Sequence, residues 1–211
     1  MNKIFQYEGK LLQTLQTIAD LMIVNILILV CCLPLVTTGA SFSAGHYTIA
    51  KIRRNEGDVI KNFFHSFKEN QKQGLCLTLV SCGGMLFLVM DIYLCSALTG
   101  VFQQIVAIIL GIIALFFGGY VTWLFPLQAT ISNRIRETLY NAFILTLLYL
   151  PKSIIMLVLY LCPIILFMLS PWFFLFLVMF GFSIPIFGAN RIYTKIFKAQ
   201  GVYARSTANN Q

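Results

Sequence analysis

Three long stretches of the chain contain no Asp, Glu, Lys or Arg: residues 21–50, 92–133 and 153–190. About 20 apolar residues are enough for an α-helix to cross the hydrocarbon core of a bilayer, which is about 30 Å thick. Backbone polar groups in lipid must be paired within the protein, so only helices and closed barrels cross it. Barrel strands alternate apolar and polar residues, whereas SIIMLVLYLCPIILFML (153–169) is apolar on every face. The stretches therefore predict an all-α, polytopic membrane bundle.

The composition also indicates that lipid is the solvent for much of the chain. Of its 211 residues, 59% are hydrophobic and 10% are charged, whereas a soluble domain has about 25% charged residues to cover its surface. We therefore expect a single membrane domain over residues 1–211, with the lipid bilayer as its first partner.

The net charge of +8 is explained by orientation in the membrane, so no nucleic-acid partner is expected. Cytoplasmic loops are enriched in Lys and Arg, and such clusters face anionic headgroups. The basic residues fall at 3 and 10, 51–72, 134–136, 152 and 191–205, whereas the turns around 34–39, 97–100 and 170–171 are uncharged. This distribution predicts a multi-pass protein of the cell membrane with its basic clusters on the cytoplasmic side.

The hydrophobic pattern divides the chain into membrane spans and amphipathic segments. We expect spans at 15–33, 75–96, 102–125 and 152–169, and a last span that ends near 188–190. Shorter amphipathic helices are expected at 3–14, 58–72 and 137–150. Pro126 should end the fourth span, Pro151 should lie in the first turn of the next helix, and a basic cytoplasmic tail should follow the last span.

Residues 37–54 leave two arrangements open. The segment is weakly apolar and rich in small residues, yet it ends in Lys51, Arg53 and Arg54. If it returns to the cytoplasm, the chain has six spans with both termini cytoplasmic. If it is an interfacial or re-entrant helix, the chain has five spans with the N-terminus outside. A weak internal repeat of elbow, rising span and descending span, over 3–54, 58–136 and 137–198, favours six.

The segment DVIKNFFHSFKENQK (58–72) has an apolar stripe at helical spacing. Phe63, Phe64 and Phe67 share this face with Val59 and Ile60. The basic residues Lys61, Lys68 and Lys72 lie elsewhere on the helix. The segment is too short to cross a bilayer, so we expect a cytoplasmic elbow helix whose phenylalanines and lysines contact lipid or a partner protein.

No catalytic, cofactor-binding or metal-ligating residues are predicted. The chain lacks Ser-Lys, GxSxG and HExxH patterns and a Gly-rich phosphate loop. His46 and His65 have no thiol or carboxylate at ligand spacing, and a zinc site needs three or four convergent ligands. The six cysteines lie within predicted spans without a CxxC pair, which is typical of thiols acting as small hydrophobes. We therefore expect a protein that is not an enzyme.

Polar and small residues within the spans are the remaining candidates. Charged groups at membrane depth are costly and often functional, which singles out Asp20 and Asp91, although Asp91 also suits the outer headgroup boundary. Asn25 can hydrogen-bond between helices, and Gly111 and Gly118 allow helices to approach closely. Helix packing is the ordinary interpretation of these glycines, and a groove or a partner contact is the alternative.

Several motifs occur in the order typical of the YesL family, a bacterial membrane family of unknown function, which the chain resembles over nearly its whole length. The shared features are Asp20 and Asn25, Leu33-Pro34 then Thr37 and Gly39, the Phe-Phe-x-x-Phe-Lys-x-Asn elbow at 63–70, Phe125-Pro126-Leu127, Asn141-Ala142-Phe143 and Leu150-Pro151-Lys152. Genes of this family commonly lie beside carbohydrate ABC importers. The resemblance implies an accessory role in carbohydrate uptake, by association with transporter or sensor subunits.

A second hypothesis is a small-solute transporter or channel in its own right. Six spans in repeated hairpins could enclose a path, as in transporters built from repeats. Asp20, Asn25 and Asp91 would then line it.

Overall fold

The computed structural model describes residues 2–131 and 134–199, and for residues 2–10 it describes the backbone alone. The regular structure of these residues is helical. The longer helices are α1 (Asn2–Cys31), α2 (Thr38–Ile52), α3 (Val59–Glu69), α4 (Gln71–Cys95), α5 (Gly100–Thr130), α6 (Ile135–Leu148), α7 (Leu150–Leu169), α8 (Phe174–Phe180) and α9 (Ser183–Ala199). Short 3-10 helices, η1 (Leu35–Thr37) and η2 (Pro171–Phe173), precede α2 and α8.

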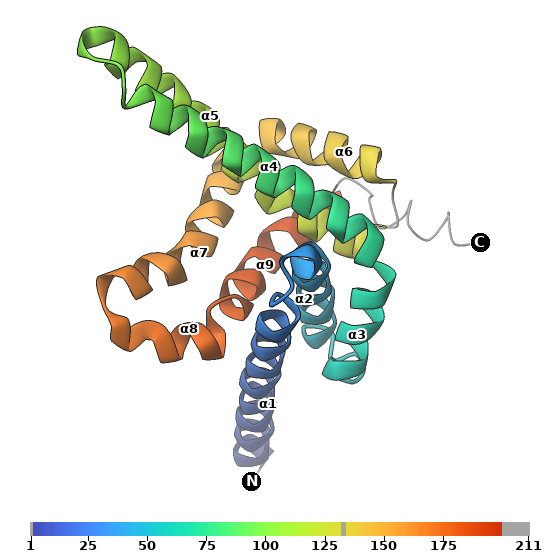
Figure 1. Ribbon diagram of the computed structural model, residues 1–211. Helices are drawn as coiled ribbons and strands as arrows, with labels where there is room; N and C mark the ends of the chain where they lie inside the picture. The colour runs from blue at the N-terminus through green and yellow to red at the C-terminus, as the bar shows by residue number, and fades with distance from the viewer. Residues whose placement is uncertain (1, 132–133, 200–211) are drawn as a thin grey trace.

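Helix α2 lies at the centre of the molecule, in contact with α1, α3, α4, α5 and α9 (Figure 1). Ten of its fifteen residues are buried. Most of these are Gly, Ala, Ser or Thr, and such small side chains let neighbouring helices approach closely. The weak hydrophobicity of the segment therefore reflects burial against protein on most sides.

The closest approach is between α2 and α4, where Gly39 meets Gly74. A Cβ atom on Gly39 would overlap the carbonyl oxygen of Gly74, and one on Gly74 would lie 2.5 Å from the backbone nitrogen of Ala40. The crossing is closed by hydrogen bonds: Gly39 N donates to Thr78 Oγ1 at 2.8 Å, and Thr78 Oγ1 donates to the Gly74 carbonyl at 2.8 Å. Both glycines are therefore required by the geometry.

The buried side chains form two hydrophobic clusters that share α9. One cluster joins α4, α5, α6, α7 and α9 around Trp123 and Phe197, and the other joins α1, α2, α3 and α9 around Ile28 and Phe63. Polar side chains add cross-links, since Trp123 Nε1 donates to Ser153 Oγ at 2.7 Å between α5 and α7. Helix α9 thus joins the two halves of the core.

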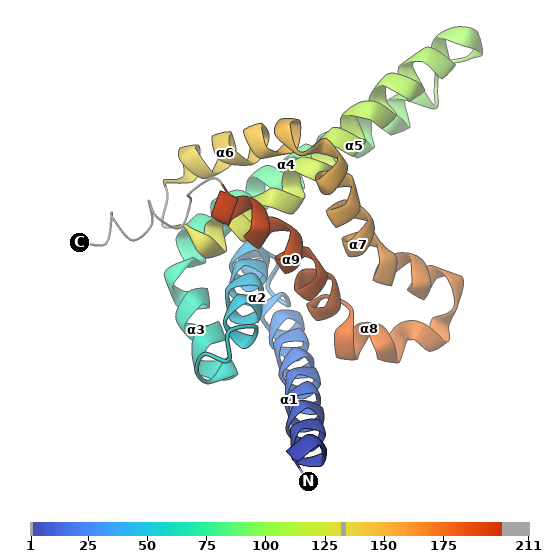
Figure 2. The same cartoon turned by 180° about the vertical axis from the view of Figure 1, so that it is seen from behind.

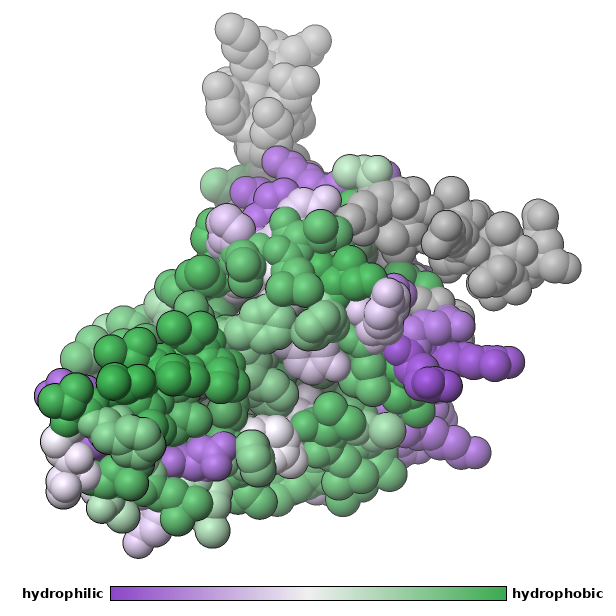
Figure 3. Space-filling model, turned by 90° about the horizontal axis from the view of Figure 1, so that it is seen from above, coloured by the Kyte–Doolittle hydropathy of each residue, from purple (hydrophilic) through white to green (hydrophobic). Residues whose placement is uncertain are grey.

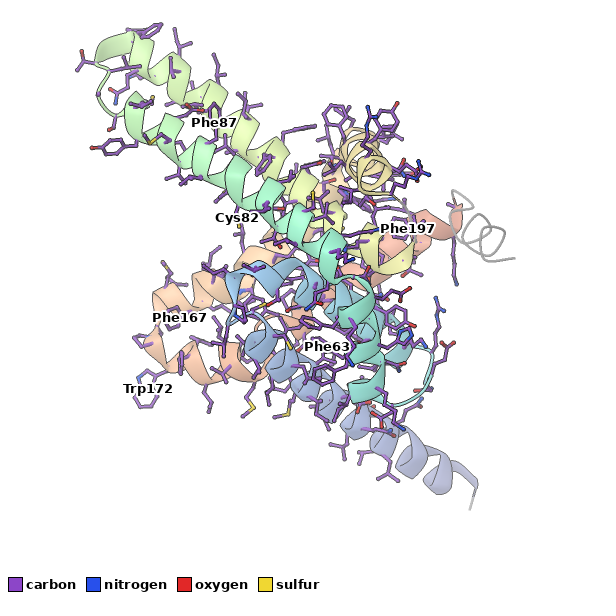
Figure 4. All side chains as sticks on the ribbon, turned by 45° about the vertical axis from the view of Figure 1, so that its right-hand side comes forward. Phe63, Cys82, Phe87, Phe167, Trp172 and Phe197 are labelled. Atoms are coloured by element: carbon purple, nitrogen blue, oxygen red, sulfur yellow. The ribbon has the colours of Figure 1, made fainter. Side chains whose placement is uncertain are left out.

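Two hairpins extend away from this core. The α4–α5 hairpin projects from the body in both ribbon views, and α7 leads through η2 to α8 in a second extension (Figures 1 and 2). From above, hydrophobic residues cover most of the extended part, and hydrophilic residues gather mainly near the opposite end (Figure 3). Phe87, Phe167 and Trp172 lie on the hairpins, away from the core (Figure 4). These surfaces suit lipid or another membrane protein.

Four described helices are long and apolar enough to cross a membrane, within Leu11–Cys31, Gln71–Cys95, Gly100–Thr130 and Leu150–Leu169. The pair α8–α9, bent by 55°, supplies a fifth if it counts as one broken span. The predicted sixth span over 37–54 is not among them, because α2 has only 15 residues and is about 22 Å long at 1.5 Å per residue. The chain is thus a helical, multi-pass membrane protein, and the positions of its termini stay a prediction.

Three predicted boundaries are wrong. Helix α1 runs without a break from Asn2 to Cys31, so the expected interfacial helix at 3–14 is not a separate element. Helix α5 continues through Pro126 to Thr130, since residues on both sides of the proline pack into the core. The expected basic tail is the second half of α9, because Tyr193 and Phe197 are buried and hold it against α5 and α7. The elbows 58–72 and 137–150 do form helices, α3 and α6.

Candidate functional site

A chain of buried hydrogen bonds passes through the core beside α2. His46 is 2% exposed, and its two ring nitrogens face two tyrosines from different helices. Nδ1 lies 3.3 Å from the hydroxyl of Tyr193 on α9, and Nε2 lies 3.3 Å from the hydroxyl of Tyr160 on α7. A neutral imidazole has one donor and one acceptor nitrogen, so it can bind both hydroxyls. The histidine joins three helices through polar contacts.

Asn190 extends this chain toward the end of α9. Its Nδ2 donates to the Tyr193 hydroxyl at 2.6 Å, and Asn190 is buried. The hydrogen-bonded series Asn190–Tyr193–His46–Tyr160 contains no carboxylate. Its contacts fix the orientation of polar side chains from α2, α7 and α9 relative to one another.

Tyr160 and His46 also line a mostly apolar pocket of about 380 Å³, together with the polar side chains of Ser81 and Thr122. The pocket lies among α2, α4, α5, α7 and the break between α8 and α9. Its apolar wall includes Phe42, Met85, Phe117, Phe125, Leu157 and Ile164. Met85 and Ile164 are exposed on the surface, so the pocket opens between α4 and α7. Its lining suits an acyl chain or an apolar side chain with one polar atom near Tyr160.

Asn25 holds the break between α8 and α9 from the facing side of α1. Its Nδ2 donates to the carbonyls of Leu177 and Val178 at 3.2 and 2.6 Å. Its Oδ1 accepts from the backbone N–H groups of Phe182 and Ser183 at 2.8 and 3.1 Å. One fully buried amide thus binds four backbone groups on the two sides of the 55° bend, and one of them, the Leu177 carbonyl, also accepts from Gly181 N at 2.9 Å. The predicted interhelical hydrogen bonding of Asn25 is present, and its partner is a broken helix.

The two predicted aspartates do not join Asn25. Asp20 is half-buried and lines a hollow with Asn55, Glu56 and Val59 near the start of α3. Asp91 is also half-buried, but it lies near the far end of α4 on the projecting hairpin. In the described part of the chain, Asp20, Asn25 and Asp91 therefore lie apart and do not line one common path.

The predicted packing residues divide into two groups. Gly39 forms the α2–α4 crossing, and a Cβ on Gly118 would lie 3.1 Å from the side chain of Leu157, so both pack against neighbouring helices. A Cβ on Gly111 would have no atom within 4 Å, so no other helix of the described chain packs closely there. Pro34 is exposed and begins the turn that leads into η1.

The predicted contact face of α3 is partly internal. Phe63 is fully buried and stacks on Phe67, with ring centroids 6.2 Å apart, and it lies between helices (Figure 4). Phe63 is therefore a core residue, and its predicted contact with lipid or a partner is wrong. Phe64 is exposed. Lys61, Lys68 and Lys72 are also exposed and remain available for contact with lipid or a partner.

Tyr160, Tyr193, Asn190 and Gly74 were not predicted as site or packing residues. Their partners are distant in sequence, and only a tyrosine inside an uncharged stretch, as at 160, gives a local sign of a buried polar role. Within the described ranges no group of three or more His, Cys, Asp or Glu side chains could hold a metal ion.

The family comparison covers the part of the chain that builds the central crossing. No curated protein and no solved structure matches the chain. Residues 21–92 match a family described as "Protein of unknown function, DUF624", which includes the YesL-type proteins. Asn25, Gly39, His46 and Gly74 all lie in this segment. Over residues 21–92, from the middle of α1 to the last turn of α4, the chain is thus similar to a family whose function is not defined.

Proposed function

We propose that this chain is a non-enzymatic accessory component that binds another membrane protein through its α4–α5 hairpin. The observation that carries the proposal is two open glycines within the helices of the hairpin; a third open glycine, Gly100, has a positive φ and lies at the turn where α5 begins. A Cβ on Gly83 or on Gly111 would meet no atom within 4 Å. Both residues are exposed, so each leaves a shallow notch on an apolar surface.

Three other glycines of these helices, by contrast, are covered by side chains of the chain itself. Gly84 is covered by the ring of Phe117, Gly118 lies against Leu157, and Gly119 lies against Ser153. Small residues at membrane helix surfaces allow a second helix to approach closely. Lipid tails gain nothing specific from such notches, whereas a transmembrane helix of a partner does.

The resemblance to the YesL family supports a partner in bacterial carbohydrate uptake. The proposed partners are the membrane subunits of a carbohydrate ABC transporter or of a sugar sensor. The exposed Lys61, Lys68 and Lys72 at the other end of the molecule supply a second contact region. In this role the chain works by association.

The test is copurification from the native membrane in a gentle detergent after crosslinking. The wild-type chain is expected to bring down a membrane partner. Gly83→Leu combined with Gly111→Leu should reduce recovery of that partner at least about tenfold, because bulk fills both notches. Cys162→Leu is the matched control, since it enlarges an exposed residue on the other hairpin. Melting temperatures in detergent check that each variant folds.

Two results would contradict the proposal. One is recovery of the chain alone at native expression together with unchanged sugar uptake after deletion of its gene. The other is equal loss of partner in the double-glycine variant and in Cys162→Leu.

A second candidate function, transport of a small solute by the chain itself, is favoured by the broken pair α8–α9. Broken helices near the membrane midplane form the substrate sites of many transporters. Purified protein in liposomes should then move a solute. Absence of flux across a panel of sugars and ions would remove this candidate.

A further inference from the structure

A hollow of about 500 Å³ lies between the C-terminal ends of α2 and α9. Of its lining residues five are basic and none is acidic; the basic ones are Arg53, Arg54, Arg191, Lys195 and Lys198. The C-termini of two helices contribute roughly −0.5 charge each. That partial charge offsets only a fraction of five cations, so the hollow carries a surplus of positive charge.

Arg53 is fixed at the edge of the hollow. Its Nη2 donates to the carbonyl of Phe187 at 2.6 Å, and its guanidinium lies 3.9 Å from the centre of the Phe187 ring. Its Nε is buried and has no hydrogen-bond partner within the protein. A second, smaller hollow of about 320 Å³ on the other side shares Arg53 and Arg191. Arg53 is thus held in place with one donor unused.

The lining of the hollow contains no acidic side chain beside Arg53, Arg191, Lys195 and Lys198. Burial lowers the pKa of Arg53, and the nearby charge of Arg191 lowers this pKa further, whereas Tyr193 acts in the opposite direction. In the part of the chain that the structure describes, Arg53, Arg191, Lys195 and Lys198 form no ion pair with a carboxylate. A bound anion would relieve the repulsion.

We propose that this hollow binds a phosphate-bearing anion, whose oxygens contact Arg53, Arg191 and Lys195. Guanidinium groups bind phosphate through paired N–H donors, and lysines add point charge. Arg191 and Lys195 are exposed, one turn apart on α9, so both can reach one ligand. The phosphate belongs to a lipid headgroup or to a small soluble phosphate, and the experiment separates these sources. The site is independent of the hairpin proposed above as a partner surface.

The experiment is native mass spectrometry of the full chain in a neutral detergent, titrated with phosphatidylglycerol. Phosphatidylcholine, whose headgroup has no net charge, is the reference lipid. Arg191→Gln combined with Lys195→Gln should weaken phosphatidylglycerol binding about tenfold or more, since each basic residue near a membrane contributes about fivefold. Lys61→Gln combined with Lys68→Gln removes the same charge from α3 and should change binding less than about twofold.

The outcomes distinguish a lipid headgroup from a small soluble phosphate as the ligand, and loss of the binding site from misfolding. Displacement of phosphatidylglycerol by millimolar inorganic phosphate assigns the site to small phosphates, and resistance to it assigns the site to a lipid headgroup. Retained binding in Arg191→Lys combined with Lys195→Arg supports the site and excludes misfolding as the cause of loss. Equal loss in both Gln pairs, or equal binding of both lipids, would overturn the proposal.

Discussion

At the scale of single residues, Asn25 shows how one amide can stabilise a broken helix. We expect Asn25→Leu to lower stability by at least about 2 kcal/mol, because it leaves buried backbone donors and acceptors unpaired, each costing about 1–3 kcal/mol. Unfolding in a detergent titration measures the change. Ile26→Ala is the control, because Ile26 is exposed on the same helix. Equal midpoints for the two variants would show that Asn25 does not hold the break.

His46 gives the second residue-scale prediction. Because His46 contacts the Tyr193 hydroxyl at 3.3 Å, the effects of His46→Phe and Tyr193→Phe on stability should not be additive. The coupling expected from a double-mutant cycle lies between about 0.5 and 2 kcal/mol, as for polar contacts in other membrane proteins. Measured unfolding free energies of both single variants and the double variant give this value. A coupling energy within error of zero would show that the two side chains do not stabilise the protein through a shared hydrogen bond.

The sequence does not predict which buried polar side chains meet in the core, as in the group His46, Tyr160, Tyr193 and Asn190. Asn25 has donors and acceptors that predict a hydrogen bond, but its partners lie more than 150 residues away. His46 and Tyr193 are 147 residues apart. Such contacts depend on how helices cross, and a single sequence carries no local pattern for that.

At the scale of helices, the α2–α4 crossing depends on Gly74, and Gly83 on the same helix supplies a matched comparison. A Cβ on Gly74 would overlap the backbone of α2, whereas one on Gly83 meets open space. We expect Gly74→Ala to destabilise the protein by about 1–3 kcal/mol through overpacking. Gly83→Ala should be neutral or stabilising by up to about 1 kcal/mol through helix propensity. Thermal melting in detergent measures both, and a similar loss in each would contradict the crossing.

Local patterns predicted the helices better than they predicted the contacts of those helices. The stripe in 58–72 correctly gave α3, and the Asp58 side chain caps it by accepting from Ile60 N at 2.9 Å. The stripe could not tell that Phe63 faces protein while Phe64 is exposed. Pro126 was expected to end its helix, because the sequence does not show that residues beyond it, such as Leu127, are buried. Tertiary packing decided these points.

At the scale of the whole molecule, the apolar stretches correctly predicted a helical membrane protein. The length that a membrane span requires is a poor guide to α2. A helix that lies against lipid must match the thickness of the hydrocarbon core. Helix α2 is surrounded by protein on most sides, so this length requirement does not apply to it. Its C-terminal end carries Arg53 and Arg54, as expected for a segment that returns to the basic end of the molecule. The crossing by α2 stays a prediction.

The side of the membrane reached by each turn can be measured directly. We expect Thr99→Cys, in the uncharged turn between α4 and α5, to react with an impermeant maleimide on intact cells. Glu56→Cys, in the turn after α2, should react only after permeabilisation, because the neighbouring Arg53 and Arg54 hold that turn in the cytoplasm. Each is made in a background without the six native cysteines. A Glu56→Cys variant that reacts on intact cells would contradict the cytoplasmic position of this basic turn. A cysteine at position 2 tests the crossing by α2, because six spans place the N-terminus on the same side of the membrane as residue 56 and five spans place it on the opposite side.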